Sequence, residues 1–117
     1  MNTPNLEELN RLHADLCSAI ADPTRILLIY QLAERPCTVG DLAARIGASQ
    51  SATSRHLKTL RERGLVHATR HGPSVAYSLE EPRLIEALDL LRSILRDTVS
   101  RRAGLLEDEQ RALGLLA

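Results

Sequence analysis

The stretch SQSATSRHLKTLRERGLV, residues 49–66, decides the fold that the sequence predicts. Ser49 is a residue type that caps helix N-termini, and apolar residues then recur every three or four positions, as on one face of a helix. Gly64 supplies the conformational freedom with which helices commonly end. We therefore predict a helix over 50–63 that buries one side and exposes the other.

The exposed side of this predicted helix has the residue types of a DNA-recognition helix. At about 100° per residue, Thr53, Leu57 and Leu60 fall together on the inward side. The outward side begins with small polar groups, which can approach base edges in the major groove, and continues into cations, which meet phosphates. The predicted DNA-binding residues are Gln50, Ser51, Ser54, Arg55, His56, Lys58 and Thr59 on the helix, with Arg70 and His71 on the segment that follows.

Charge is unevenly distributed along the chain. The 117 residues carry 15 basic and 15 acidic side chains, so the net charge is zero. Residues 49–71 nevertheless contain five basic residues against one acidic residue, together with three of the four histidines. A neutral protein with one basic face can bind a polyanion at that face. The alternative is an ordinary solvated helix surface.

The flanking sequence predicts two helices before this one. Asp22 can cap a helix whose first position is Pro23 and which ends before Pro36. Thr38 can cap a short helix that ends at Gly47. Two short helices joined by a tight turn that contains glycine form a helix-turn-helix, here predicted over 38–63.

Beyond Gly64 the pattern changes to short β-prone segments around a Gly-Pro turn, which predicts a two-stranded wing over 65–79. Amphipathic helices are expected over 1–22 and 82–104, with a C-terminal tail that frays or adds one turn. Their apolar seams exceed the needs of one small core and indicate a homodimer. The predicted dimer residues are Leu9, Leu12, Leu16, Leu84, Leu88, Leu91 and Leu95. We thus predict a single domain over 1–117, mainly α with a small β-hairpin wing.

Several classes of protein do not fit the sequence. The apolar run ILLIY, residues 26–30, is far shorter than the roughly 20 residues of a membrane helix, and no basic apolar leader opens the chain. Two cysteines without a framework spacing indicate reduced thiols in a cytoplasmic protein. No catalytic triad and no phosphate-binding loop is recognisable, so we expect neither an enzyme nor a cofactor.

Three segments together resemble the arsenic- and metal-responsive repressor family, ArsR/SmtB, over almost the whole chain. They are ADPTRILLIYQL, TVGDLAARIGASQSATSRHLKTLRERGLV and RHGPSVAYSL. The resemblance implies a winged helix-turn-helix that dimerises through its first and last helices. It also implies a repressor that binds double-stranded operator DNA and is released by an effector.

The chain departs from the family at its familiar metal sites. The Cys-x-Cys positions hold Thr38 and Gly40, and residues 82–104 contain no His or Cys, so no metal site is carried over. Two alternatives stay open: a thiol-based sensor of redox, persulfide or arsenite, and a winged-helix module for protein contacts. The possible sensor residues are Cys17, which is the better placed, Cys37 and His13. Alternatively, Cys17 is a small buried apolar residue on the dimer helix. The sequence identifies no effector.

Overall fold

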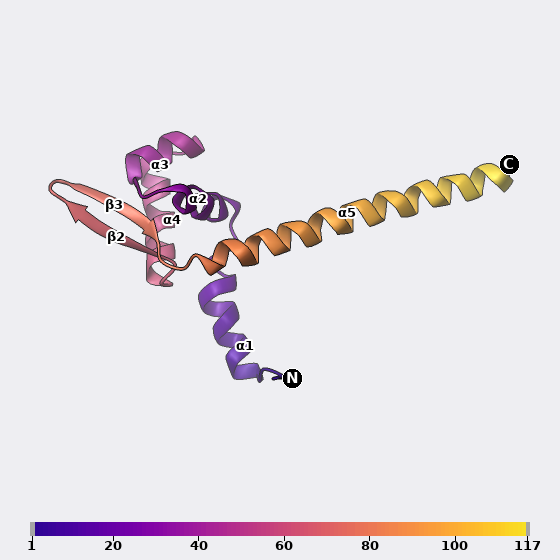
Figure 1. The fold of residues 1–117 in the computed structure, drawn as a ribbon, viewed down its shortest axis with the longest axis horizontal. Coiled ribbons are helices and arrows are strands. Elements are labelled where there is room, and N and C mark those ends of the chain that lie inside the picture. The colour runs from indigo at the N-terminus through magenta and orange to yellow at the C-terminus, as the bar shows by residue number, and fades with distance from the viewer. Residues whose placement is uncertain (1, 117) are drawn as a thin grey trace. The chain divides into compact units, whose positions relative to one another are not determined.

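The computed structural model describes the backbone of residues 2–116 and the side chains of residues 2–114. It forms two compact units, Met1–Pro82 and Arg83–Ala117. The single domain expected over 1–117 stays a prediction. The elements of the first unit (Figure 1) are α1 (Leu6–Leu12), η1 (His13–Cys17), α2 (Pro23–Glu34), β1 (Cys37–Thr38), α3 (Val39–Ile46), α4 (Gln50–Glu62), β2 (Val66–His71) and β3 (Ser74–Leu79). The second unit is the helix α5 (Arg83–Leu116).

The first helical segment begins as predicted but changes its winding. Asn5 caps α1, since its side chain accepts a hydrogen bond of 2.8 Å from the backbone N–H of Glu8. The chain then continues as η1, a π-helical turn in which the backbone N–H of Ser18 donates to the carbonyl oxygen of His13 at 2.9 Å. Within the predicted span 1–22, helix therefore covers only residues 6–17.

The α2 helix is the buried centre of the first unit, as its sequence predicts. The Asp22 carboxylate accepts from the backbone N–H groups of Thr24 at 2.8 Å and Arg25 at 3.2 Å, and Pro23 occupies the first turn. Burial raises the pKa of Asp22, but these hydrogen bonds and the nearby charge of Arg25 outweigh it and lower that pKa below 3.8. The cap is therefore a charged carboxylate at neutral pH.

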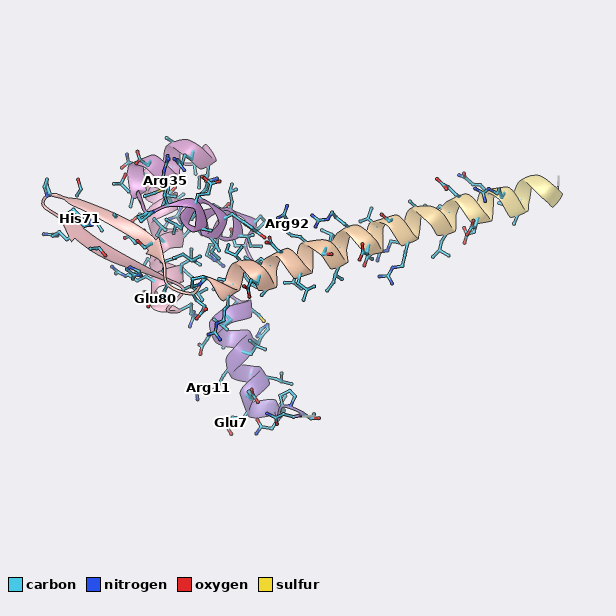
Figure 2. The ribbon with its side chains drawn as sticks, in the orientation of Figure 1. Glu7, Arg11, Arg35, His71, Glu80 and Arg92 are labelled. Atoms are coloured by element: carbon cyan, nitrogen blue, oxygen red, sulfur yellow. The ribbon has the colours of Figure 1, made fainter. Side chains whose placement is uncertain are left out.

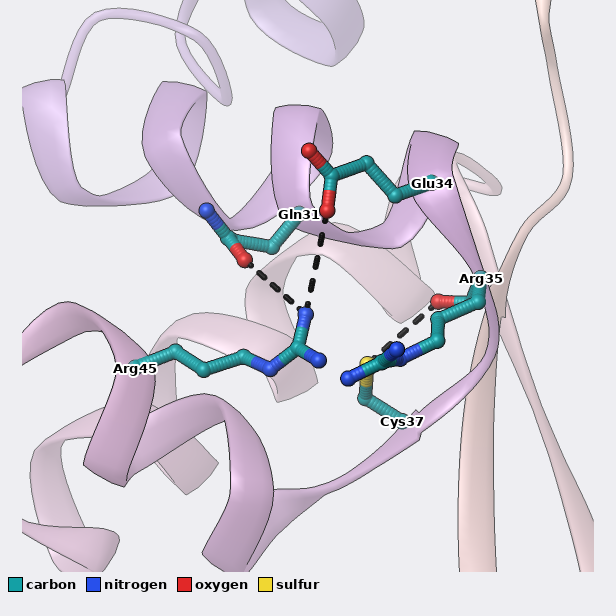
Figure 3. A network of polar contacts seen from close by, with 5 residues as sticks. All are labelled: Gln31, Glu34, Arg35, Cys37 and Arg45. Carbon is teal, nitrogen blue, oxygen red and sulfur yellow. Dashed lines mark hydrogen bonds and ion pairs between the residues drawn. The ribbon is translucent and has the colours of Figure 1, made fainter.

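The helix-turn-helix is formed by α3 and α4, within the predicted boundaries. Thr38 caps α3, and Ser49 caps α4 through a 3.1 Å hydrogen bond from the backbone N–H of Ala52. Gly47 ends α3 with a φ of +70°, a left-handed conformation that costs glycine little. Arg45 connects α3 to α2, because its Nη1 donates to Gln31 at 3.2 Å and lies 3.8 Å from the Glu34 carboxylate (Figure 3).

The wing is part of a three-stranded antiparallel sheet with strand order β1-β3-β2. The hairpin of β2 and β3 was predicted, and its Gly-Pro turn follows His71. The strand β1 was not predicted. Cys37 pairs with Tyr77 and Thr38 with Ala76, so two residues before α3 join the sheet edge. A strand of two residues carries no periodicity of its own, and only its partner β3 makes it a strand.

The prediction for the last helix was wrong at its C-terminal end. The α5 helix does not end near Gly104 but runs without interruption over 34 residues to Leu116. A glycine inside a helix costs about 1 kcal/mol relative to alanine. The surrounding Leu, Glu, Arg and Ala residues are strong helix formers, and they outweigh that cost.

The core of the first unit places α4. Its inward residues Thr53, Leu57 and Leu60 are fully buried, as predicted, against a core that includes Leu28 and Leu42. The Thr53 hydroxyl is satisfied by a 2.8 Å hydrogen bond to the carbonyl oxygen of Ser49. A mainly α fold with a β-hairpin wing beside a helix-turn-helix is a winged helix-turn-helix, and the predicted fold class is confirmed.

Candidate nucleic-acid interface

The outward side of α4 carries the predicted row of polar and basic side chains. Its N-terminal end exposes small hydrogen-bonding groups and its middle exposes cations. Lys58 forms an ion pair of 4.0 Å with Glu62, but both side chains are more than half exposed, so this pair is weak and leaves the ammonium available. The exposed members of the row are Gln50, Ser51, Ser54, Arg55 and Lys58, and Thr59 is partly exposed.

His56 does not belong to this row. Its ring is half-buried, and Nδ1 lies 3.3 Å from Nη1 of Arg25 on α2. The side chain therefore faces the first turn of α2, in contrast to the outward position expected for a DNA contact. No local pattern predicts this contact, because the two residues lie 31 positions apart.

The wing presents the other two predicted residues. Arg70 and His71 are exposed at the end of β2, where they pair with Val75 and Ser74 of β3. His71 lies at the tip of the hairpin (Figure 2). At the opposite end of β2, His67 Nδ1 lies 2.5 Å from a carboxylate oxygen of Glu80. A cation and an imidazole at the tip can reach a phosphate backbone beside the groove that α4 reads.

The predicted dimer residues differ in exposure. Leu9, Leu12 and Leu16 are all exposed in the single chain, although each has an apolar side chain. On α5, Leu91 and Leu95 are 53% and 62% exposed. Leu88 is only 4% exposed and Leu84 is half-buried, so these two offer little surface to a partner.

The possible sensor residues lie on two elements. His13 and Cys17 are exposed on η1, whereas Cys37 is buried in β1. Its thiol donates to the carbonyl oxygen of Arg35 at 3.3 Å (Figure 3). Burial of Cys17 as a small apolar residue is thus not seen in the single chain. Both thiols are free. Within the described residues, no three or more His, Cys, Asp or Glu side chains gather into a group that could hold a metal ion.

Over the described part of the chain, no helix combines the length and apolar character needed to span a membrane. A winged helix-turn-helix with an exposed polar and basic second helix is the architecture typical of DNA-binding transcriptional regulators.

Comparison with known proteins gives the family. Residues 22–68 match the model of the bacterial regulatory proteins of the arsR family. The HTH-type transcriptional regulator Rv0081 of Mycobacterium tuberculosis is 36% identical over 103 residues, which cover 87% of this chain and 90% of that protein. The chain belongs to the ArsR family, as the sequence predicted.

Three solved structures share this fold, and the two that are more than 30% identical agree with the family assignment. The crystal structure of Rv0081 superposes with a TM-score of 0.72 at 34% identity, covering 81% of this chain and 96% of that one. The NMR structure of the cadmium metal-sensor CmtR of M. tuberculosis is 44% identical over 67% of this chain and 81% of that one, with a TM-score of 0.57. The homodimeric winged helix-turn-helix domain Mb0332 of Mycobacterium bovis shares the fold at 21% identity, with a TM-score of 0.69 over 86% of this chain and 95% of that one.

Proposed function

We propose that this regulator is a cytoplasmic, homodimeric repressor that inserts α4 of each copy into the major groove of operator DNA and is released by an effector. One observation carries the proposal. On α4, a row of exposed small polar and cationic side chains lies opposite three fully buried residues, Thr53, Leu57 and Leu60. The helix is thus anchored on one side and free to contact DNA on the other. The activity is binding and includes no catalytic step.

Different parts of α4 perform different tasks in this proposal. Gln50, Ser51 and Ser54 stand in the first turns, where a recognition helix contacts base edges. A good bidentate base contact discriminates by about 1–3 kcal/mol against the wrong base. Arg55 and Lys58, with Arg70 of the wing, neutralise phosphates and supply affinity that depends on salt but not on sequence.

In the proposed homodimer, each of the two copies of the chain contributes one recognition helix, α4. The exposed leucines of α1 and α5 supply apolar surface, and Mb0332, which has the same fold, is a homodimer. A two-fold dimer of this class reads two half-sites about one helical turn apart, roughly 34–36 Å. We accordingly expect an operator with inverted symmetry.

The effector in this proposal does not act through the family's familiar metal positions, which hold Thr38 and Gly40 here. CmtR is described as a cadmium sensor, but neither of these side chains offers a thiolate. A second candidate function is a thiol sensor, favoured by Cys17, which is exposed on the first helical segment beside the leucines of the proposed dimer. A protein-contact module is less favoured, because the outward side of α4 lacks apolar anchors.

The test begins with selection of duplexes from a random library by the wild-type protein. Gln50→Ala and Ser51→Ala should alter the preferred sequence. Arg55→Ala and Lys58→Ala should instead weaken all duplexes alike and reduce the slope of log K against log salt by about one unit each. Arg111→Ala, which removes an exposed arginine of α5 outside the proposed interface, is the matched control.

For the proposal to hold, the Gln50 and Ser51 variants must change the preferred sequence, and the Arg55 and Lys58 variants must change overall affinity and the salt slope. If Gln50→Ala and Ser51→Ala select the same sequences as the wild type, α4 is not the reading helix. If the wild type selects no duplex at all, the proposed repressor function is wrong.

A further inference from the structure

One side chain connects the first helical segment to the recognition helix. Arg25, in the first turn of α2, donates from Nε to the carbonyl oxygen of Ala19 at 2.5 Å and from Nη2 to that of Ser18 at 3.0 Å. Its third nitrogen, Nη1, lies 3.3 Å from Nδ1 of His56 in the middle of α4. A single guanidinium thus contacts the turn after η1 and the helix proposed to read DNA.

The chemistry of this contact is directional. A guanidinium has five N–H donors and no acceptor, so in this contact Arg25 donates and Nδ1 of His56 is the acceptor. The planar fork lets Arg25 serve two carbonyls and the ring at once, which the single ammonium of lysine cannot reproduce. The geometry therefore depends on arginine at position 25 rather than on a positive charge alone.

Arg25 is itself held in place. Its backbone N–H donates to the Asp22 carboxylate that caps α2. The half-buried side chain of Arg25 therefore extends from a backbone position that the Asp22 cap holds.

A second, weaker contact joins the same two segments. Nη1 of Arg63, which follows the last turn of α4, lies 3.5 Å from the carboxylate of Asp15 on η1. Both side chains are substantially exposed, so this pair contributes little by itself. Together, however, the contacts connect residues 13–19 to α4 at its middle and at its end.

We propose that Arg25 is a positioning residue for DNA recognition: it fixes α4 against the first helical segment through the carbonyls of Ser18 and Ala19 and the ring of His56. It contacts no DNA. The inference rests on the proposed reading role of α4. It also explains how the first segment, which carries the exposed leucines of the proposed dimer, sets the position of the recognition helix.

The experiment compares Arg25→Met, His56→Leu and the double variant with the wild-type protein, on a selected duplex and on an unrelated one. Arg25→Met should weaken the selected duplex about tenfold, because α4 is no longer held in the position that reads it; tenfold corresponds to about 1.4 kcal/mol. Binding to the unrelated duplex and the salt slope should stay unchanged. Arg35→Met is the matched control, because it removes an exposed arginine at the other end of α2.

The double variant tests the contact itself. In the wild-type background His56→Leu should weaken the selected duplex about fivefold, whereas in the Arg25→Met background it should change affinity less than twofold, because the contact is already absent. Thermal unfolding of each variant shows whether it is folded, and His56→Leu removes the same contact with Arg25 intact.

Three outcomes would overturn the inference. The first is wild-type affinity of Arg25→Met. The second is a salt slope reduced by about one unit with equal weakening of both duplexes, which would make Arg25 a phosphate contact. The third is additive effects of the two substitutions. If one of these outcomes occurs while Arg55→Ala still weakens all duplexes alike and reduces the salt slope, only the positioning role of Arg25 is wrong. If the wild type selects no duplex, the proposed function is wrong as well.

Discussion

Replacement of Gly64 by alanine should destabilise the protein through the backbone alone. Gly64 has a φ of +76°, and a Cβ added there would meet no atom within 4 Å, so no steric clash contributes. The left-handed conformation costs an ordinary residue about 1–2 kcal/mol. Alanine regains about 0.4–1 kcal/mol by restricting the unfolded chain. The net expectation is a loss of about 1 kcal/mol.

The matched control is the same substitution in α5. Gly104 is helical and also meets no atom within 4 Å. Gly104→Ala should therefore stabilise by up to about 1 kcal/mol, the difference in helix propensity. Two identical changes in the same chain thus have opposite signs, and only the backbone conformation distinguishes them.

Thermal unfolding followed by far-UV circular dichroism measures both variants. Protein concentration is held constant, because dimer stability depends on it. For a chain of this size, 1 kcal/mol corresponds to a shift in Tm of about 4 °C. Gly64→Ala should lie about that far below the wild type, with Gly64→Asn between them because asparagine tolerates the left-handed region. An unchanged or raised Tm for Gly64→Ala would refute the reasoning.

Three other predictions concern stability, assembly and release. The folded pKa of Asp22 lies below 3.8, so the stability that its charged form contributes is complete above the unfolded pKa and is lost as the pH falls through the folded pKa. Asp22→Asn should therefore reduce the fall of the free energy of unfolding at acid pH, as measured by urea unfolding. An identical fall in the variant and the wild type would contradict this expectation. Leu91→Glu should yield monomers in sedimentation velocity at micromolar concentration, whereas a wild-type monomer under those conditions would refute the dimer. Cys17→Ser with Cys37→Ser should abolish DNA release by arsenite or oxidants, and undiminished release by zinc or arsenite would mean that a metal site has been overlooked.

Most of the fold follows from short-range signals in the sequence. Asp22, Thr38 and Ser49 were predicted as helix caps, and each accepts the expected backbone hydrogen bond. The leucine spacing of α4 correctly predicted its buried side, because helical periodicity needs only neighbouring residues. The composition of the outward side likewise predicted which α4 residues are exposed, with the exceptions of His56, which is half-buried and faces α2, and Thr59, which is only partly exposed.

Tertiary structure alone decided the features that join distant segments. The strand β1 exists because β3 offers it partners, and two residues have no pattern of their own. His56 turns toward Arg25 because α2 packs on α4, a contact across 31 positions that no local periodicity encodes. The burial of Cys37 and the exposure of Cys17 were decided in the same way, since burial depends on what the rest of the chain places over a side chain.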